Sequence, residues 1–229
     1  MAQSTSRPLS IVCVGGHPDD PESGCGGTLA RYSAAGHRVT IVYLTRGEAG
    51  IPGKSHDEAA AIRTAESIAA CKIIGAKPVF AGQIDGATVV DRAAAESLTK
   101  LISAEQPDIV LTQWPIDTHP DHVAASTLTF RAWVAAKRSF DVYYYEVNFG
   151  SQTLDFHPTD YVDITAVREK KKAALFAHKS QNGEEIYRDY HEPMENFRGR
   201  EYGVAAAEAF IHLARVSGAR GTLPGLGRV

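Results

Sequence analysis

The chain has 229 residues, of which 44% are hydrophobic and 22% charged, and its mean hydropathy of −0.20 is ordinary for a globular protein. This composition excludes the collagen, coiled-coil and disordered classes, and a formal net charge of −3 gives no electrostatic footprint for nucleic acid or an anionic membrane surface. We expect a single domain over residues 1–229. We also expect it to be cytoplasmic, because the three cysteines have no CxxC spacing and no apolar run is long enough to span a membrane.

Short apolar runs alternate along the chain with segments of helical periodicity. In chain order, we expect strands at 9–14, 39–44, 78–81, 108–112, 142–147 and 161–164, and helices at 28–35, 57–74, 91–104, 120–136, 166–178 and 204–215. The polar C-terminal segment 182–229 is expected to be partly irregular, with a loose tail at 221–229. This alternation predicts an α/β fold with a mainly parallel sheet and helices on both faces.

Two similar motifs follow two of the expected strands. Residues 17–20 read His-Pro-Asp-Asp, and residues 119–122 read His-Pro-Asp-His. A single tripeptide of this kind is usually a turn or a helix cap, but two at the ends of separate strands favour a site, because ligands bind beyond the carboxyl ends of such strands. A catalytic zinc takes three protein ligands and leaves a position for water. The two motifs together offer three ligands and spare acid and base groups.

The paired motifs resemble those of the zinc-dependent N-deacetylases of the PIG-L/LmbE type, and the likeness runs from about Ser10 to Gln181. Weaker supporting features are the segment 44–50, Arg63 with Glu66, and the segment 177–181. The family usually has a glutamate directly after the paired aspartates, whereas Pro21 precedes Glu22 in this chain. The ligand positions are unaffected, and the role of this glutamate stays open.

The resemblance implies a Rossmann-like fold and the removal of an acetyl or longer acyl group from an amino sugar. By motif position, it implies that His17, Asp20 and His122 are the metal ligands. The metal implied is Zn²⁺, although a set of nitrogen and oxygen ligands also suits Fe²⁺ or another divalent ion.

The resemblance also implies the catalytic roles. Asp19 would be the general base that acts on the metal-activated water. His119, oriented by Asp121, would stabilise the tetrahedral intermediate and could protonate the leaving amine. Arg63 would reach a polar or anionic part of the substrate, or else pair with Glu66 on a solvated helix face.

The expected partner is a small N-acylated amino sugar whose aglycone is not identified by the sequence; inositol, malate, a second sugar, a peptide and a lipid-linked group all remain open. One alternative is a metal-dependent hydrolase of a different amide or ester. Another is a non-catalytic sugar- or nucleotide-binding module with a structural metal. The spare acid and base groups argue against the last, since a structural zinc normally closes its fourth position with protein.

The segment Asn182–Arg200 is expected either to cover the site and set specificity or to form a contact in a homo-oligomer. Members of the family often assemble, but no repeat in this sequence indicates a number of subunits. The three lysines at 170–172 are expected to be surface charge, and His178 is expected to be a satisfied structural histidine.

Overall fold

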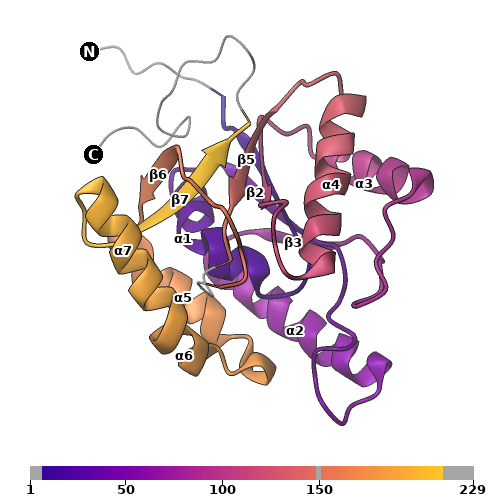
Figure 1. Ribbon diagram of the computed structural model, residues 1–229, viewed down its shortest axis with the longest axis horizontal. Coiled ribbons are helices and arrows are strands. Elements are labelled where there is room, and N and C mark those ends of the chain that lie inside the picture. Colours follow the sequence, from indigo (N-terminus) through magenta and orange to yellow (C-terminus); the bar gives the residue numbers. More distant parts are fainter. Residues whose placement is uncertain (1–6, 148–150, 214–229) are drawn as a thin grey trace.

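The computed structural model describes residues 7–147 and 151–213, which form a seven-stranded sheet with helices on both faces (Figure 1). The strands are β1 Ser10–Gly15, β2 Arg38–Tyr43, β3 Lys77–Phe80, β4 Ile109–Gln113, β5 Asp141–Tyr145, β6 Asp160–Asp163 and β7 Ala207–His212. The helices are α1 Asp20–Ala34, α2 His56–Ile74, α3 Arg92–Ala104, α4 Pro120–Ala135, α5 Arg168–Phe176, α6 Gly183–Ile186 and α7 Glu192–Tyr202. Short 3-10 turns at Thr165–Val167 and Lys179–Gln181 and a π-helical turn, η3 Tyr187–His191, complete them.

The strand order is β3-β2-β1-β4-β5-β7-β6, and the pairs among β1 to β5 are parallel. The last strand, β7, lies antiparallel between β5 and β6. From β1 the chain first builds β2 and β3 on one side and then β4 on the other. The mainly parallel α/β fold expected from the alternation is therefore confirmed, with a switch in strand order between β1 and β4.

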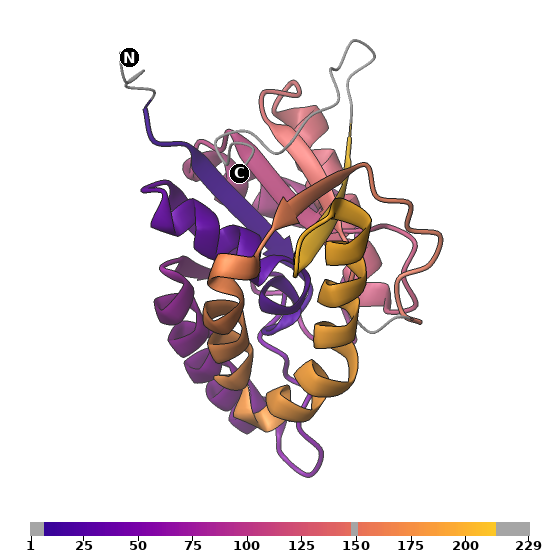
Figure 2. The same cartoon turned by 90° about the vertical axis from the view of Figure 1, so that its left-hand side faces the viewer.

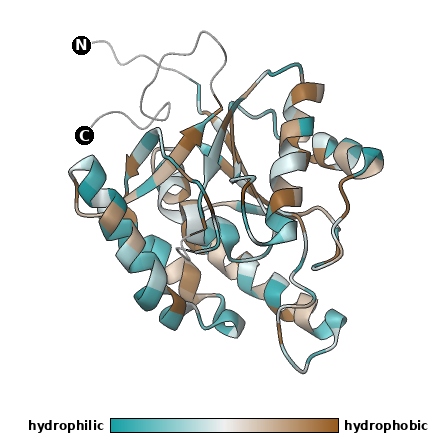
Figure 3. Cartoon of the chain, in the orientation of Figure 1, coloured by the Kyte–Doolittle hydropathy of each residue, from teal (hydrophilic) through white to brown (hydrophobic). Residues whose placement is uncertain are grey.

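The sheet is buried on both faces, because parallel strands need helices on each side. Along β1, Ile11 and Cys13 pack into one core cluster with α1, α2 and α5, whereas Val12 and Val14 pack into the other with α3 and α4. Figure 2 shows α5 beside α1 and α2, and Figure 3 shows the apolar residues that line the central strands.

Helix α2 follows its local sequence closely. Ser55 and Glu58 form a capping box at its start, and Gly75 ends it in the left-handed conformation with φ 85°. By contrast, α1 begins at Asp20, well before the expected residue 28, and is kinked at Cys25. A Cβ atom at Gly24 would collide with the ring of Tyr145, so the glycine-rich part of α1 packs directly against β5. Close packing of the sheet explains why this stretch is helical despite its low helix propensity.

Two expectations about the C-terminal third are wrong. The helix expected at 204–215 is instead the strand β7, because its apolar residues fill the gap between β5 and β6, and the polar stretch 183–202 before it is helical. Lys171 is fully buried rather than exposed, because Glu195 and Glu208 pair with it inside the fold. The tail at 221–229 lies outside the described residues. No helix within the described ranges has the length and apolar character to cross a membrane.

Candidate active site

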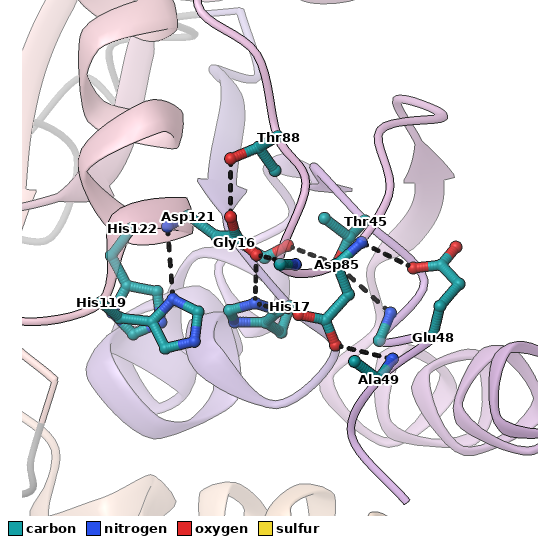
Figure 4. A network of polar contacts seen from close by, with 12 residues as sticks. Gly16, His17, Thr45, Glu48, Ala49, Asp85, Thr88, His119, Asp121 and His122 are labelled. Atoms are coloured by element: carbon teal, nitrogen blue, oxygen red, sulfur yellow. Dashed lines mark hydrogen bonds and ion pairs between the residues drawn. The ribbon is translucent and has the colours of Figure 1, made fainter. Parts of the chain in front are cut away.

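The two His-Pro-Asp motifs meet at the switch point of the sheet, as the sequence predicts. Residues 17–20 follow β1 and lead into α1, and residues 119–122 follow the loop after β4 and open α4. The ring centroid of His17 lies 4.6 Å from that of His119 and 5.3 Å from that of His122. Figure 4 shows the three imidazoles side by side. Adjacent strand ends therefore bring residues a hundred positions apart into one cluster.

Asp20 lies between two of these histidines. Its Oδ2 atom is 3.1 Å from His17 Nδ1 and 3.3 Å from His122 Nε2, and it accepts a 2.7 Å hydrogen bond from the backbone N–H of His17. All three residues are buried. Burial alone raises the pKa of Asp20, but the adjacent His122 and His17 imidazoles hold it well below its usual range. One ionised oxygen thus faces two imidazole nitrogens.

The other nitrogen of each histidine is held by further carboxylates. His17 Nε2 lies 3.1 Å from both Asp121 Oδ2 and Asp85 Oδ1, and His122 Nδ1 lies 3.1 Å from Asp117 Oδ1. Histidines that bind a metal through one nitrogen usually have the other on a carboxylate or a carbonyl. These contacts leave His17 Nδ1 and His122 Nε2 directed at the shared carboxylate, which is a donor set that fits a divalent ion.

Within the described residues, two other groups have candidate ligand atoms that all lie within 4.8 Å of one another: His17, His119 and His122; and His17, Asp85, His119 and Asp121. In the second group both carboxylates already have other hydrogen bonds. Asp85 accepts from the backbone N–H of Ala49 at 3.1 Å, and Asp121 accepts from that of Gly86 at 2.8 Å. Both carboxylates of this group are therefore hydrogen-bonded to the backbone of neighbouring loops.

His119 caps the N-terminus of α4. Its Nδ1 atom accepts a 3.2 Å hydrogen bond from the backbone N–H of Asp121, which assigns the proton of the neutral ring to Nε2. Burial lowers the pKa of His119, and the nearby His17 and His122 lower it further. The Asp121 carboxylate reaches His17 and the Thr88 hydroxyl instead. The expectation that this carboxylate orients His119 is therefore wrong, because only the backbone of Asp121 contacts that ring.

Asp19 lies at the cavity wall in an unusual backbone conformation. Its φ of 108° is rare for any residue other than glycine, and such strain tends to persist at functional sites. Arg63 Nη2 lies 3.2 Å from Asp19 Oδ2 and also donates to the carbonyl of Pro18. Burial raises the pKa of Asp19, while the Arg63 guanidinium opposes that rise. The Asp19 carboxylate is thereby held next to the histidine cluster, with a pKa above the usual value for aspartate.

Arg63 is buried in α2, and its exposed pairing with Glu66 is excluded. A Cβ atom at Gly47 or Gly50 would collide with the guanidinium, so the loop before α2 packs directly on it. Glu66 instead accepts hydrogen bonds from the backbone N–H and the hydroxyl of Ser180, at 2.8 and 2.6 Å. This difference arises because the segment after α5 covers α2. Arg63 does line the cavity, where a substrate could reach it.

A cavity of about 500 Å³ opens onto these side chains, a volume within the range of small-molecule sites. One wall carries the two motifs together with Arg63 and Asp85. Other lining residues come from the C-terminal third, including Gln181, Ile186 and His191. Part of the segment 182–200 therefore lies at the site, as one of the two sequence expectations proposed.

Glu22 and His178 lie together beneath the first turn of α1. Glu22 is fully buried, accepts a 2.5 Å hydrogen bond from the Tyr43 hydroxyl, and has its Oε1 3.3 Å from His178 Nε2. His178 also lines the cavity, and among the described residues neither Nδ1 nor Nε2 makes a hydrogen bond of good geometry, so its contact with Glu22 is an ion pair by distance. Burial lowers the pKa of His178, but the Glu22 carboxylate outweighs this and leaves it raised. The expectation of a satisfied structural histidine is thus wrong.

Sequence reasoning missed three residues of the site: Asp85, Asp117 and Gln152. Asp117 gave a weak signal, since it stands two residues before His119 and accepts its backbone N–H at 2.8 Å, as an Asx turn does. Asp85 lies before a glycine in the loop after β3, which reads only as a turn. Nothing in the sequence around Gln152, whose Nε2 lies 3.2 Å from His122 Nδ1, marks it as part of a site.

Comparison with known proteins gives consistent results. The family model described as PIG-L, GlcNAc-PI de-N-acetylase, matches residues 12–133. A 1D-myo-inositol 2-acetamido-2-deoxy-alpha-D-glucopyranoside deacetylase of Mycobacteroides abscessus is 31% identical, in a match that covers 77% of this chain and 82% of the relative.

Solved structures share the fold over most of the chain. The N,N'-diacetylchitobiose deacetylase of Pyrococcus horikoshii superposes with a TM-score of 0.77 at 27% identity, covering 89% of this chain and 83% of that one. The 4-carboxy-2-hydroxymuconate hydratase GalB of Pseudomonas putida KT2440 superposes with a TM-score of 0.80 at 23% identity, covering 92% of this chain and 99% of that one. The second likeness concerns the fold alone.

Proposed function

The chain belongs to the PIG-L family and is an N-deacetylase, and we propose that it hydrolyses the N-acetyl group of a small N-acetylglucosamine glycoside with a divalent metal held by His17, Asp20 and His122. The observation that carries the proposal is the position of Asp20 Oδ2, within 3.3 Å of one nitrogen of each histidine. Carboxylates on the opposite nitrogens of both rings support the same ligand set. Zn²⁺ is our first choice of metal, and Fe²⁺ also suits these ligands.

The chain's own residues account for the movement of protons. A bound divalent ion supplies Lewis-acid chemistry, since it lowers the pKa of water and polarises a carbonyl. Asp19 takes one proton from the attacking water as the water oxygen bonds to the acetyl carbon. The Nε2–H of His119 donates a hydrogen bond to the developing oxyanion. When the C–N bond breaks, the proton held by Asp19 passes to the amine nitrogen, which leaves as the free amino sugar.

The electrostatics of the cluster support these roles. The low pKa of His119, caused by burial and by its two neighbouring histidines, keeps the ring neutral and fixed as a hydrogen-bond donor. The raised pKa of Asp19, caused first by burial, suits a carboxylate that must accept a proton. Arg63 orients this carboxylate and lines the cavity. We therefore assign Arg63 to the orientation of Asp19 and to a polar contact with the substrate.

The substrate class follows from the relatives and from the cavity. The similar proteins are named for an inositol glycoside and for diacetylchitobiose, so they share an N-acetylglucosamine unit and differ in the group attached to it. A cavity of about 500 Å³ is large enough for such a two-ring compound. We propose that the acetamide lies at the motif wall and that the attached group faces Ile186 and His191 of the C-terminal third.

The test is acetate release from a panel that contains N-acetylglucosamine, diacetylchitobiose and N-acetylglucosaminyl inositol, with metal-stripped and Zn²⁺- or Fe²⁺-reconstituted protein. Metal-dependent release is expected, and it should vanish in the His122→Ala protein with loss of metal binding. Metal bound at one equivalent without release from any compound would reject the N-acetylglucosamine substrate. In that case a panel of longer N-acyl amides and esters would identify the alternative hydrolase.

A further inference from the structure

The segment after α5 places His178 against the buried Glu22, beside the proposed metal site. We propose that Glu22 and His178 act as a pair of positioning residues, which hold the first turn of α1 and so fix the orientation of Asp19 and Asp20. This inference rests on the proposed function for its metal site. It assigns a role to the glutamate that follows Pro21 and to the histidine in the segment 177–181, neither of which takes part in the steps above.

The first argument is the location of the Glu22 carboxylate. Glu22 is in the first turn of α1, two residues after the proposed ligand Asp20, and its side chain is buried in the core with 0% exposure. There its Oε1 has two partners, the Tyr43 hydroxyl at 2.5 Å and His178 Nε2 at 3.3 Å. Tyr43 belongs to β2 and His178 follows α5, so one carboxylate joins three separate parts of the fold.

The second argument is that a carboxylate buried in the core needs polar partners, because burial of an unpartnered polar group is strongly unfavourable. His178 is 1% exposed, and its Nε2 lies 3.3 Å from Glu22 Oε1, close enough to be such a partner. Without it, the first turn of α1 would have to shift toward solvent, and Asp19 and Asp20 would move with it.

The third argument is that the turn that carries His178 is itself held in place by other parts of the fold. Ser180 is bound by Glu66 of α2 through both its backbone N–H and its hydroxyl, at 2.8 and 2.6 Å. Gln181 Nε2 donates to the carbonyl of Gly50 at 3.1 Å. These bonds fix the turn that carries His178 against α2 and the loop before it. Because this turn is anchored on both sides, His178 is suited to hold Glu22 in place.

The experiment measures metal affinity and catalysis separately in Glu22→Gln, His178→Asn and the double variant. Metal affinity is read from Zn²⁺ competition and from the visible absorption of the Co²⁺-loaded protein, neither of which requires a substrate. We expect each single variant to bind metal about 10-fold or more weakly, to alter the Co²⁺ spectrum, and to lower kcat with a smaller change in KM. The double variant should lose no more metal affinity and no more kcat than the more impaired of the two single variants, because the two residues act as one pair.

The matched control is His37→Asn, which makes the same chemical change at the opposite end of the sheet, where His37 Nδ1 accepts from the Leu9 backbone N–H. It should leave metal affinity, the Co²⁺ spectrum and kcat unchanged. If His178→Asn does not fold, Tyr43→Phe removes a single hydroxyl from the same carboxylate. Its effect on metal affinity should be present in the wild-type background and absent in the Glu22→Gln background.

Two outcomes would overturn the proposal. Single variants that lose thermal stability but keep metal affinity, spectrum and kcat within twofold of the wild type would show that the pair only packs the core. Additive losses in the double variant would show that the two residues act independently. Wild-type protein that binds metal but releases no acetate would contradict the proposed function alone, since the metal measurements would still decide the role of the pair.

Discussion

Asp19 combines a strained backbone, a half-buried carboxylate and a guanidinium partner within one residue of the proposed ligand Asp20. We expect Asp19→Asn to lower kcat by about 100-fold or more, since general base catalysis is typically worth about 10² to 10⁴. Metal content, measured by atomic absorption, should remain at one equivalent, because the substitution removes no proposed ligand. Full activity in a metal-loaded Asp19→Asn protein would eliminate this residue as the base.

The contact of Asp121 with His17, rather than with His119, leads to a second prediction. Asp121→Asn should weaken metal binding by about 10- to 100-fold, because a carboxylate behind a ligating histidine raises its basicity and fixes its orientation. Titration of the stripped protein with Zn²⁺ measures this effect. If the variant kept its metal affinity and lost only kcat, Asp121 would instead serve the hydrogen-bond donor His119.

At the scale of single residues, the sequence predicts the motif residues well and predicts poorly the residues that hold them in position. Residues 17–20 and 119–122 are recognisable because several chemically apt side chains occur together after apolar runs. Asp85 and Asp117 belong to loops of ordinary turn composition, and their function depends on which imidazole faces them. Side-chain direction of this kind is determined by tertiary packing, so the motif alone predicts a contact of the Asp121 carboxylate with His119, whereas the carboxylate lies against His17.

Among the elements, α1 depends on a close approach to β5. Gly24→Ala should destabilise the protein by about 1–3 kcal/mol, because the new Cβ would enter the space of the Tyr145 ring. Gly26→Ala is a matched control two residues along, where the added atom would approach Lys171 Cγ to 3.3 Å and Glu22 Cβ to 3.9 Å without a collision, so a smaller loss is expected. Urea unfolding measures both free energies. Equal effects at the two glycines would contradict the steric explanation.

The elements that sequence patterns predicted correctly are those with strong local signals. Helix α2 has its capping box and a terminal glycine, and β1 is a continuous apolar run closed by two glycines. The strand β7 is a mixed stretch that contains Glu208 and His212, and its strand conformation comes from pairing with β5 and β6 on either side. Such pairing partners are distant in the sequence, so a local pattern cannot distinguish this strand from a helix.

At the scale of the whole molecule, Lys171 holds the C-terminal third to the sheet. Its Nζ lies 3.0 Å from Glu195 in α7 and 2.7 Å from Glu208 in β7, and all three side chains are buried. Glu208 also accepts from the backbone N–H groups of Gly27 and Thr28, at 2.8 and 2.7 Å, directly after the kink of α1. Lys171→Met should therefore cost about 3–5 kcal/mol at neutral pH, because it removes the cation that two buried carboxylates share.

The pH dependence of this loss follows from Glu195. Burial raises the pKa of Glu195, but Lys171 and then Arg168 more than offset this, and the folded-state pKa is lowered. A lowered pKa contributes stability above the unfolded value near 4.3, and that stability is lost as the pH falls through and below this value. Urea unfolding should show a smaller difference between wild type and Lys171→Met at pH 4 than at pH 7. A difference that grows on acidification would contradict the assignment.

The position of β7 also bears on how the protein is made. It is the last strand of the described chain to leave the ribosome, yet its place is between two strands synthesised earlier. Until it arrives, β6 has no neighbour in the sheet, and Lys171 lacks one of its two carboxylate partners. The halves of the site that follow β1 and β4 emerge well before that moment. The nascent chain therefore passes through a stage in which both His-Pro-Asp motifs have been synthesised but the strand that joins β5 to β6 has not.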